Sequence, residues 1–199
     1  MTPKPPKPPK PAMTPTHPLP SQSGRHPATA AVRVHPSPIG TLALAATQEA
    51  LVLCAFTDAE GAGRRLAKAG LRPVDDGSAT PAQRRLLDAA RDQLDGYLAG
   101  SRREFTVPVD LRLATPFSRE TVGSLDALVP YGRTTTYGAL ATALGRPGAA
   151  RAVGTALGAN PLCVLLPCHR VVAGSGRDSG YAGGIEAKRT LLALEAAAA

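Results

Sequence analysis

The distribution of proline limits what this 199-residue chain can fold into more than any other feature. Residues 1–30 hold ten of the twenty prolines and four basic residues, but no acidic residue. The little apolar surface in this stretch cannot offset the entropy lost on ordering it, so we predict a disordered, partly polyproline-II tail. A folded core must therefore come from residues 31–199.

Charge and composition narrow the class of protein. The formal net charge is +8, but half of it lies in the tail, so charge alone is weak evidence for a nucleic-acid partner. Three unevenly spaced cysteines do not form a disulfide framework and indicate a reducing compartment. There is neither an apolar run of transmembrane length nor the apolar segment of a secretory signal. We expect a soluble, cytoplasmic protein without a membrane partner.

Residues 31–115 have the pattern of a small α+β domain. The predicted elements are strands within residues 31–57, a helix over Gly61–Gly70, a helix from Thr80 to Gly100 and a strand over Phe105–Leu113. Thr80 followed by Pro81 is a typical helix start. Strict alternation predicts that the last strand is half-buried, and Pro108 favours an edge position. This region contains no cluster of side chains suited to catalysis.

The predicted secondary structure changes at residues 115–116, after which most of the predicted elements are helices. A helix is predicted over Phe117–Leu128, and two shorter ones over Tyr137–Leu144 and Ala149–Ala159 are joined by a glycine-containing turn. This spacing fits a helix-turn-helix, although an ordinary αα-hairpin has the same spacing. The third helix is made almost entirely of small residues, with Arg151 near its positively polarised start. That composition suits a DNA groove better than a protein core.

Cys168 is the candidate nucleophile. A continuous apolar run, Leu162–Leu166, predicts a buried strand or extended segment leading into Pro-Cys-His-Arg. A thiol of pKa about 8.5 is only about 3% thiolate at pH 7, and lowering that pKa to about 6 requires about 3.4 kcal/mol of differential interaction. One cation or a polarised histidine next to the thiol is sufficient for this.

Other assignments of the cysteines are weaker. A buried, inert cysteine is the usual alternative, and we assign it to Cys54 and Cys163. A zinc site lacks a fourth ligand with suitable spacing. His169 follows Cys168 directly, and neighbours on an extended chain point to opposite sides, so a turn or a bridging water is needed for it to act as the base.

The remaining segments suggest a pocket. The glycine-rich residues 174–184 depart from a dinucleotide-binding pattern and more plausibly form the wall of a pocket beside the cysteine. A closing helix is predicted over Ile185–Leu194, ending at Glu195, whose carboxylate is able to orient an imidazole.

Taken together, these residues resemble the methylated-DNA–protein-cysteine methyltransferases, also called 6-O-alkylguanine-DNA alkyltransferases. The matching motifs are Val129-Pro130-Tyr131-Gly132, Thr136-Tyr137, Ala150-Arg151-Ala152-Val153-Gly154, Asn160-Pro161, Pro167–Val172, Tyr181–Gly184, Lys188, Leu191-Leu192 and Glu195. The most specific is Pro-Cys-His-Arg-Val in register with Arg-Ala-Val-Gly.

The resemblance implies an α+β fold in two domains after the tail at residues 1–30. Residues 31–115 would form a ribonuclease-H-like α/β domain without nuclease activity. Residues 116–199 would form a mostly helical DNA-binding and alkyltransferase domain with a winged-helix-like helix-turn-helix.

The same resemblance implies DNA repair by direct reversal. The protein would bind duplex DNA as a monomer through the minor groove, flip the damaged nucleotide out of the stack and transfer its alkyl group irreversibly to Cys168. The expected substrate is 6-O-methylguanine, with 4-O-methylthymine as a second candidate. Neither cofactor nor metal is expected, and each molecule would act once.

Residue roles also follow from the resemblance. Glu195 and His169 would deprotonate Cys168 through a water, and Tyr137 would assist rotation of the nucleotide and hydrogen-bond the base at N3. The expected DNA-binding residues are Tyr137, Ala150, Arg151, Ala152 and Gly154, with Arg151 filling the vacated space in the stack. The expected pocket residues are Asn160, Val171, Tyr181, Ala182 and Gly183. Ala182 stands where some members have a serine that donates to the guanine oxygen, a loss of about 1 kcal/mol.

Two alternatives belong to other functional classes. A non-enzymatic lesion-binding relative would have the reactive cysteine replaced, typically by tryptophan, whereas Cys168 is present and the chain contains no tryptophan. A transcriptional regulator that senses alkylation or oxidation at Cys168 would need an effector or dimerisation segment, which residues 1–115 do not show.

Overall fold

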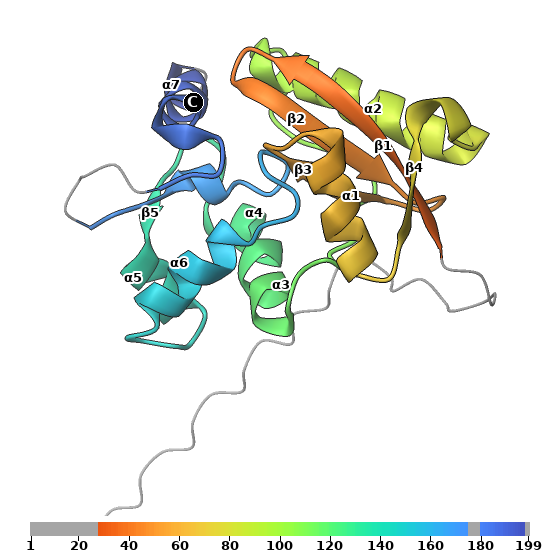
Figure 1. The fold of residues 1–199 in the computed structure, drawn as a ribbon. Helices are drawn as coiled ribbons and strands as arrows, with labels where there is room; N and C mark the ends of the chain where they lie inside the picture. Colours follow the sequence, from red (N-terminus) through yellow and green to blue (C-terminus); the bar gives the residue numbers. More distant parts are fainter. Residues whose placement is uncertain (1–27, 175–179, 198–199) are drawn as a thin grey trace, which may run out of the picture.

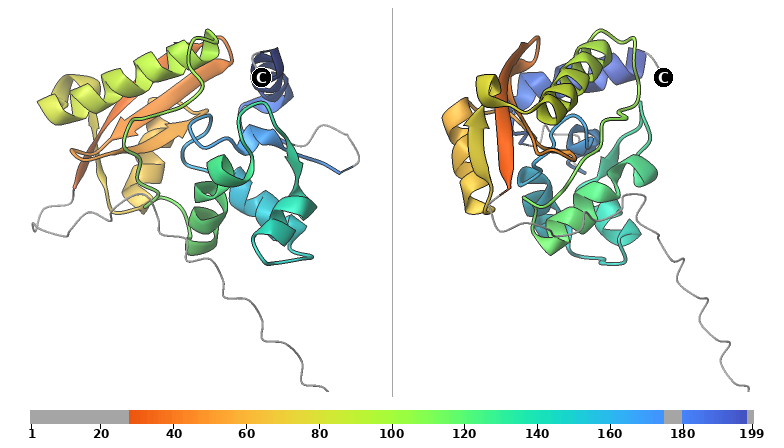
Figure 2. Two further views of the ribbon diagram at one scale, coloured as in Figure 1. Left: turned by 180° about the vertical axis from the view of Figure 1, so that it is seen from behind. Right: turned by 90° about the vertical axis from the view of Figure 1, so that its right-hand side faces the viewer.

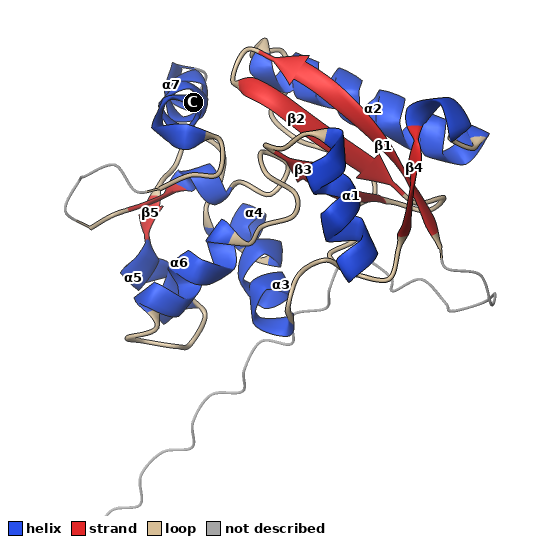
Figure 3. Cartoon of the chain, viewed as in Figure 1, coloured by secondary structure: helices blue, strands red, loops and turns tan. Residues whose placement is uncertain are grey.

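The computed structural model describes residues 28–174 and 180–197. The predicted disorder of the proline-rich tail and part of the glycine-rich segment therefore lie outside the described residues. Figure 1 shows a sheet with its helices on one side of the molecule and a group of short helices on the other. The coloring by secondary structure in Figure 3 shows that strands are concentrated in the first of these parts. The α+β class is confirmed.

The first part is built on a four-stranded sheet. The strands are β1 (Thr29–Ser37), β2 (Gly40–Ala46), β3 (Leu51–Ala55) and β4 (Arg72–Asp75), in the order β3-β2-β1-β4. The β1–β2 and β2–β3 pairs are antiparallel, and β4 runs parallel to β1. The strands expected within residues 31–57 are confirmed, whereas the short edge strand β4 was not predicted.

One helix covers each face of this sheet (Figures 1 and 2). Alternate residues of β2 divide between the two sides: Ala43 and Ala45 pack with α1 (Ala59–Lys68), while Leu42 and Leu44 pack with α2 (Pro81–Leu98). The two faces are apolar because each is buried. The apolar core between the sheet and α2 continues into the helical part, so both parts share one apolar interior.

The start of α2 confirms its predicted cap. The Thr80 hydroxyl accepts from the Gln83 amide at 3.3 Å, and the Gln83 side chain accepts from the Thr80 amide at 2.9 Å. This reciprocal pair is a capping box, with Pro81 in the first turn. The cap fixes where α2 begins and thereby which residues its far end brings to the other part of the molecule.

The predicted strand over Phe105–Leu113 is wrong. Only Val109 forms a bridge, to Leu51 of β3, and the rest of the segment is irregular. The Gln93 side-chain oxygen of α2 accepts from the amides of Thr106 and Val107 at 2.7 and 3.1 Å, so these donors are used by a helix and not by a neighbouring strand. Pro108 has no backbone N–H and therefore cannot donate a hydrogen bond to a neighbouring strand.

The second part is mostly helical. Its elements are α3 (Pro116–Gly123), α4 (Leu125–Leu128), β5 (Thr135–Thr136), α5 (Tyr137–Ala143), α6 (Ala150–Gly158), the 3-10 helix η2 (Cys168–Arg170), β6 (Val171–Val172) and α7 (Gly184–Ala197), while a 3-10 helix η1 (Asp76–Ser78) lies in the first part. The single helix expected over Phe117–Leu128 is broken at Ser124, whose hydroxyl donates to the Thr121 carbonyl at 2.9 Å. The helix pair α5 and α6 pack together as the helix-turn-helix pattern requires.

The segment Leu162–Leu166 is buried as expected, but it is not a regular strand. The Leu166 amide donates to the Leu162 carbonyl at 2.9 Å, and Val164 has a φ of 72°, so the chain turns back on itself. Next to this turn lies Cys54, in the edge strand β3. Its backbone amide donates to the Pro161 carbonyl at 2.8 Å, and its carbonyl accepts from the Cys163 amide at 2.7 Å. The turn before Cys168 is thereby fixed to the sheet of the first part.

Candidate active site

Cys168, His169 and Arg170 occupy the single turn η2, which packs against α7. The turn changes the direction of successive side chains, so the geometric objection to a cysteine and histidine on an extended chain does not apply. The closing helix runs to Ala197, and Glu195 therefore lies in its last turn and not at its end. Cys168, His169 and Glu195 are 7%, 0% and 1% exposed.

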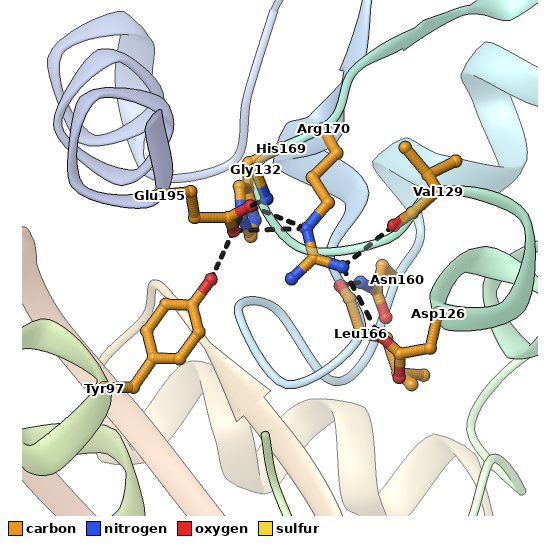
Figure 4. Close-up of polar contacts among 9 residues, drawn as sticks. All are labelled: Tyr97, Asp126, Val129, Gly132, Asn160, Leu166, His169, Arg170 and Glu195. Carbon is orange, nitrogen blue, oxygen red and sulfur yellow. Dashed lines mark hydrogen bonds and ion pairs between the residues drawn. The ribbon is translucent and has the colours of Figure 1, made fainter. Parts of the chain in front are cut away.

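The carboxylate of Glu195 is the centre of a buried network (Figure 4). Its Oε1 atom accepts from the Tyr97 hydroxyl and from Nε2 of His169, the latter at 2.5 Å. Its Oε2 atom accepts from the Gly132 amide and from Nε of Arg170, both at 2.9 Å. Burial by itself raises the pKa of Glu195, but the hydrogen bonds from His169, Tyr97 and Gly132 outweigh it and hold this pKa at about 2. Glu195 is therefore ionised at neutral pH.

Burial sets the protonation of His169. It lowers the pKa of the imidazole, the positive charges of Arg170 and Lys188 act in the same direction, and Glu195 acts against them. A neutral imidazole that donates from Nε2 to Glu195 carries its lone pair on Nδ1. This Nδ1 atom is buried and has no hydrogen-bond partner among the described residues. His169 is thus arranged as a proton acceptor.

The thiol of Cys168 is surrounded by groups that favour its ionised form. Its pKa lies below the ordinary value because the Cys163 thiol donates to it, the Asn160 amide donates to Sγ at 3.2 Å, and Lys188 contributes its charge, while burial opposes these effects. Cys163 lies between two acceptors, this sulfur and the Asn160 carbonyl at 3.7 Å. Its own pKa is raised well above the ordinary value. Cys163 therefore remains a thiol, with one proton to donate to one of these two acceptors.

Cys168 opens onto a cavity of about 260 Å³. The lining residues are Tyr137, Gly154, Leu157, Gly158, Cys168, Gly180, Tyr181 and Ala182. The ring of Tyr137 lies against Gly154, where a Cβ would be 3.7 Å from two of its atoms. The helix-turn-helix and the segment Gly180–Ala182 therefore both line the cavity at the sulfur.

Three of the expected pocket residues do not line this cavity. Asn160 lies behind Cys168, where its amide also donates to the Leu166 carbonyl at 3.0 Å and so ties the turn to the end of α6. The Val171 carbonyl accepts from Nζ of Lys188 at 2.7 Å. A Cβ at Gly183 would lie 2.5–2.7 Å from the ring of Phe56, so this glycine allows the chain to cross closely over the first part.

Three of the expected DNA-binding residues, Ala150, Arg151 and Ala152, lie at the start of α6, and a fourth, Tyr137, begins α5. Arg151 and Ala152 are exposed and Ala150 is half-buried. The Arg151 guanidinium forms no ion pair or hydrogen bond with any other part of the chain that the structure describes. Gly154 lies one turn further along α6, at the cavity itself. Arg151 is therefore free to reach a ligand outside the protein.

Three residues around Glu195 were not predicted. Tyr97 and Gly132 donate to its carboxylate, and Arg170, which is 4% exposed, bridges it to the Val129 carbonyl at 2.9 Å (Figure 4). In the sequence, Tyr97 only continues the apolar face of α2. A buried tyrosine needs a partner for its hydroxyl, and this was the one available signal, but it does not identify a partner 98 positions away.

Comparison with known proteins agrees with this architecture. Residues 32–111 match the ribonuclease-like domain of 6-O-methylguanine DNA methyltransferase, and residues 116–197 match the DNA-binding domain of the same family. Within the described ranges, no helix is both long and apolar enough to cross a membrane.

Individual relatives lead to the same family. A methylated-DNA–protein-cysteine methyltransferase of Mycobacterium tuberculosis is 50% identical over 55% of this chain, and one of Methanosarcina acetivorans is 35% identical over 80% of it. The match spans 65% of the mycobacterial relative but 94% of the archaeal one.

Solved structures extend the similarity to the whole fold. The crystal structure of the Mycobacterium tuberculosis O6-methylguanine methyltransferase has a TM-score of 0.69 and 38% identity, covering 86% of this chain and 95% of its own. A structure described as the M. tuberculosis protein in complex with DNA has a TM-score of 0.68, also at 38% identity, over 85% of this chain and 94% of its own. On these grounds, the chain belongs to the family of 6-O-methylguanine DNA methyltransferases.

Proposed function

We propose that this protein repairs alkylated duplex DNA by transferring the alkyl group of 6-O-methylguanine to Cys168 in a single, irreversible event. The observation that carries the proposal is the position of Cys168. Its sulfur opens onto a cavity beside the helix-turn-helix, and the buried His169 and Glu195 stand next to it. Support also comes from relatives named for this activity and from a similar structure described as bound to DNA.

The first step is the loss of the thiol proton. We infer that a water between Sγ and the Nδ1 atom of His169 carries this proton to the imidazole, because Nδ1 bears the lone pair. Glu195, ionised and hydrogen-bonded to Nε2, stabilises the imidazolium that forms. Asn160 and Cys163 donate to the sulfur and thus stabilise the thiolate.

The thiolate then attacks the alkyl carbon in line with the departing base. A sulfur–carbon bond forms, the carbon–oxygen bond breaks and its electron pair stays on the guanine oxygen. Tyr137, at the cavity wall, would hydrogen-bond the base at N3 and offset the developing negative charge. The base then takes up one proton to become ordinary guanine. The thioether is stable, so each molecule would act once.

Access to the alkylated atom requires that the nucleotide leave the stack. We propose that Arg151, exposed at the start of α6, enters the vacated space, and that the small side chains of Ala150, Ala152 and Gly154 allow α6 to approach the minor groove closely. Tyr181 and Ala182 line the cavity that would receive the base. We further propose that the protein acts as a monomer in the cytoplasm and that 4-O-methylthymine is a second substrate.

The decisive experiment uses a duplex containing 6-O-methylguanine with a radiolabelled methyl group. The label is expected on the protein, saturating at one methyl per molecule and located on Cys168 by mass spectrometry. Cys168→Ala should abolish the transfer. Cys54→Ala is the matched control, because Cys54 is equally buried but does not line the cavity, and it should transfer normally. Label that stays on bound DNA would refute the reaction and favour the lesion-binding alternative.

A further inference from the structure

A second cavity, of about 570 Å³, lies where the C-terminal end of α6 meets α1 and the segment that connects the two parts of the chain. Its lining residues are Arg65, Lys68, Ala69, Arg112, Leu113, Ala114, Thr115, Gly158 and Ala159. We propose that this cavity, here called the basic groove, binds the phosphate backbone of the DNA strand whose base enters the cavity at Cys168. The proposal extends the proposed function to a DNA contact made by the ribonuclease-like domain.

The charge of the basic groove is the first support. Three of its lining residues are cationic and none is acidic. Arg112 is held by Asp110, whose Oδ2 atom lies 2.5 Å from Nη2. In contrast, the side chains of Arg65 and Lys68 form no hydrogen bond or ion pair with residues 28–174 and 180–197. Two uncompensated positive charges in one concave site favour an anionic partner.

The neighbouring arginine shows that this is a property of the groove and not of the whole helix. Arg64 lies on α1 next to Arg65, but its guanidinium is bonded to Glu60 at 2.5 Å on the exposed side of the helix and does not line the groove. On α1, the two cations that line the groove have no carboxylate partner among the described residues, whereas Arg64, which does not line it, is paired with Glu60.

The position of the groove is the second support. Gly158 lines both the groove and the cavity at Cys168, so the two sites adjoin each other at the end of α6. A Cβ at Gly158 would meet no atom within 4 Å, which means that the space in front of its backbone is open. A strand that delivers a base to Cys168 thus passes directly beside Arg65 and Lys68.

The dimensions fit a nucleic-acid strand. Helix α6 has nine residues, and at 1.5 Å per residue its ends lie roughly 13 Å apart. This length corresponds to roughly four nucleotide steps of 3.4 Å along one strand. Arg151 in the vacated space and the basic groove at the other end of α6 are therefore able to contact one strand at points roughly four nucleotides apart.

The test is the salt dependence of DNA binding. The double variant Arg65→Ala/Lys68→Ala should bind a 6-O-methylguanine duplex with a slope of log K against log salt that is smaller by about 1.8, which corresponds to about 60-fold weaker binding at 0.1 M salt. Arg64→Ala removes one cation from the same helix outside the groove and should keep the wild-type slope. The reaction of both variants with free 6-O-benzylguanine should be unchanged, because that substrate has no phosphate.

Two results would overturn the proposal. One is a double variant whose slope equals that of wild type and Arg64→Ala. The other is a groove that binds inorganic phosphate, seen as a higher Tm of the wild-type protein only, with no change in the slope for DNA. A failure of the proposed reaction gives a different result. If the variants show the expected slopes but the wild-type protein takes up no methyl label, alkyl transfer is refuted and DNA binding in the basic groove is still supported.

Discussion

The hydroxyl of Tyr97 is the point at which the ribonuclease-like domain reaches the candidate catalytic network. Tyr97→Phe removes this hydroxyl and leaves the ring, which lies 5.0 Å from the ring of Phe105 and 5.9 Å from that of Tyr131. A hydrogen bond to a charged group contributes about 1.5–3 kcal/mol. Because Glu195 is 1% exposed, water does not replace the lost donor, and the free energy of unfolding should fall by a similar amount.

The same substitution should also change the protonation of His169. With one donor fewer, the carboxylate of Glu195 attracts the proton on Nε2 more strongly, so the pKa of His169 rises. One pKa unit corresponds to about 1.36 kcal/mol, so if half of the hydrogen-bond energy acts on the imidazole, the pKa of His169 rises by about 0.5–1 unit. The acidic limb of the pH–rate profile then shifts to higher pH by the same amount. The assay is the single-turnover rate with free 6-O-benzylguanine as a function of pH, beside chemical denaturation at pH 7.

Tyr131→Phe is the matched control for this experiment. The Tyr131 hydroxyl is buried but has no hydrogen-bond partner within the described part of the chain. Its removal should change neither the stability nor the pH profile. If Tyr97→Phe lowers the stability but leaves the acidic limb at its wild-type pH, the hydroxyl has a structural role only, and the reasoning about His169 is refuted.

Three further predictions concern DNA access, packing and acid stability. Arg151→Ala should slow repair of duplex DNA by about 10–100-fold while sparing free 6-O-benzylguanine, because unstacking requires a few kcal/mol; equal losses on both substrates would contradict its role in the stack. Gly183→Ala should lower stability by about 1–3 kcal/mol because its Cβ would lie 2.5–2.7 Å from the Phe56 ring, whereas Gly174→Ala, with no atom within 4 Å, should be neutral in the same denaturation assay. The pKa of Glu195, about 2 against an ordinary 4.5, implies about 3 kcal/mol of stability that is present above pH 4.5 and lost as the pH falls towards 2. Glu195→Gln should lack this dependence, and a wild-type unfolding curve that is flat over that pH range would disprove it.

Features that depend on a few neighbouring residues were predictable. The start of α2 follows from Thr80 and Pro81, and the helix-turn-helix follows from a glycine-containing turn between two short helices. Each of these signals arises from backbone preferences or from side chains within four positions. The Pro-Cys-His-Arg motif likewise directed attention to Cys168 without any knowledge of its surroundings.

The alternation over Phe105–Leu113 shows the limit of such signals. The apolar residues do alternate, but the donors of Thr106 and Val107 found their acceptor in Gln93 of α2 and not in a strand. Periodicity reports which side chains are apolar, and it contains no information about where the backbone finds its hydrogen bonds.

By itself, the sequence determined the fold class, the family resemblance and the candidate nucleophile, because these depend on composition, periodicity and short motifs. Only the tertiary structure decided which side chains surround the thiol and where the groove that we propose for DNA lies. The donors to Glu195 come from α2, from Gly132 and from η2, and the basic groove combines α1 with the end of α6. The physical reason is that hydrogen bonds and Coulomb forces act over a few ångströms in space, whatever the separation along the chain.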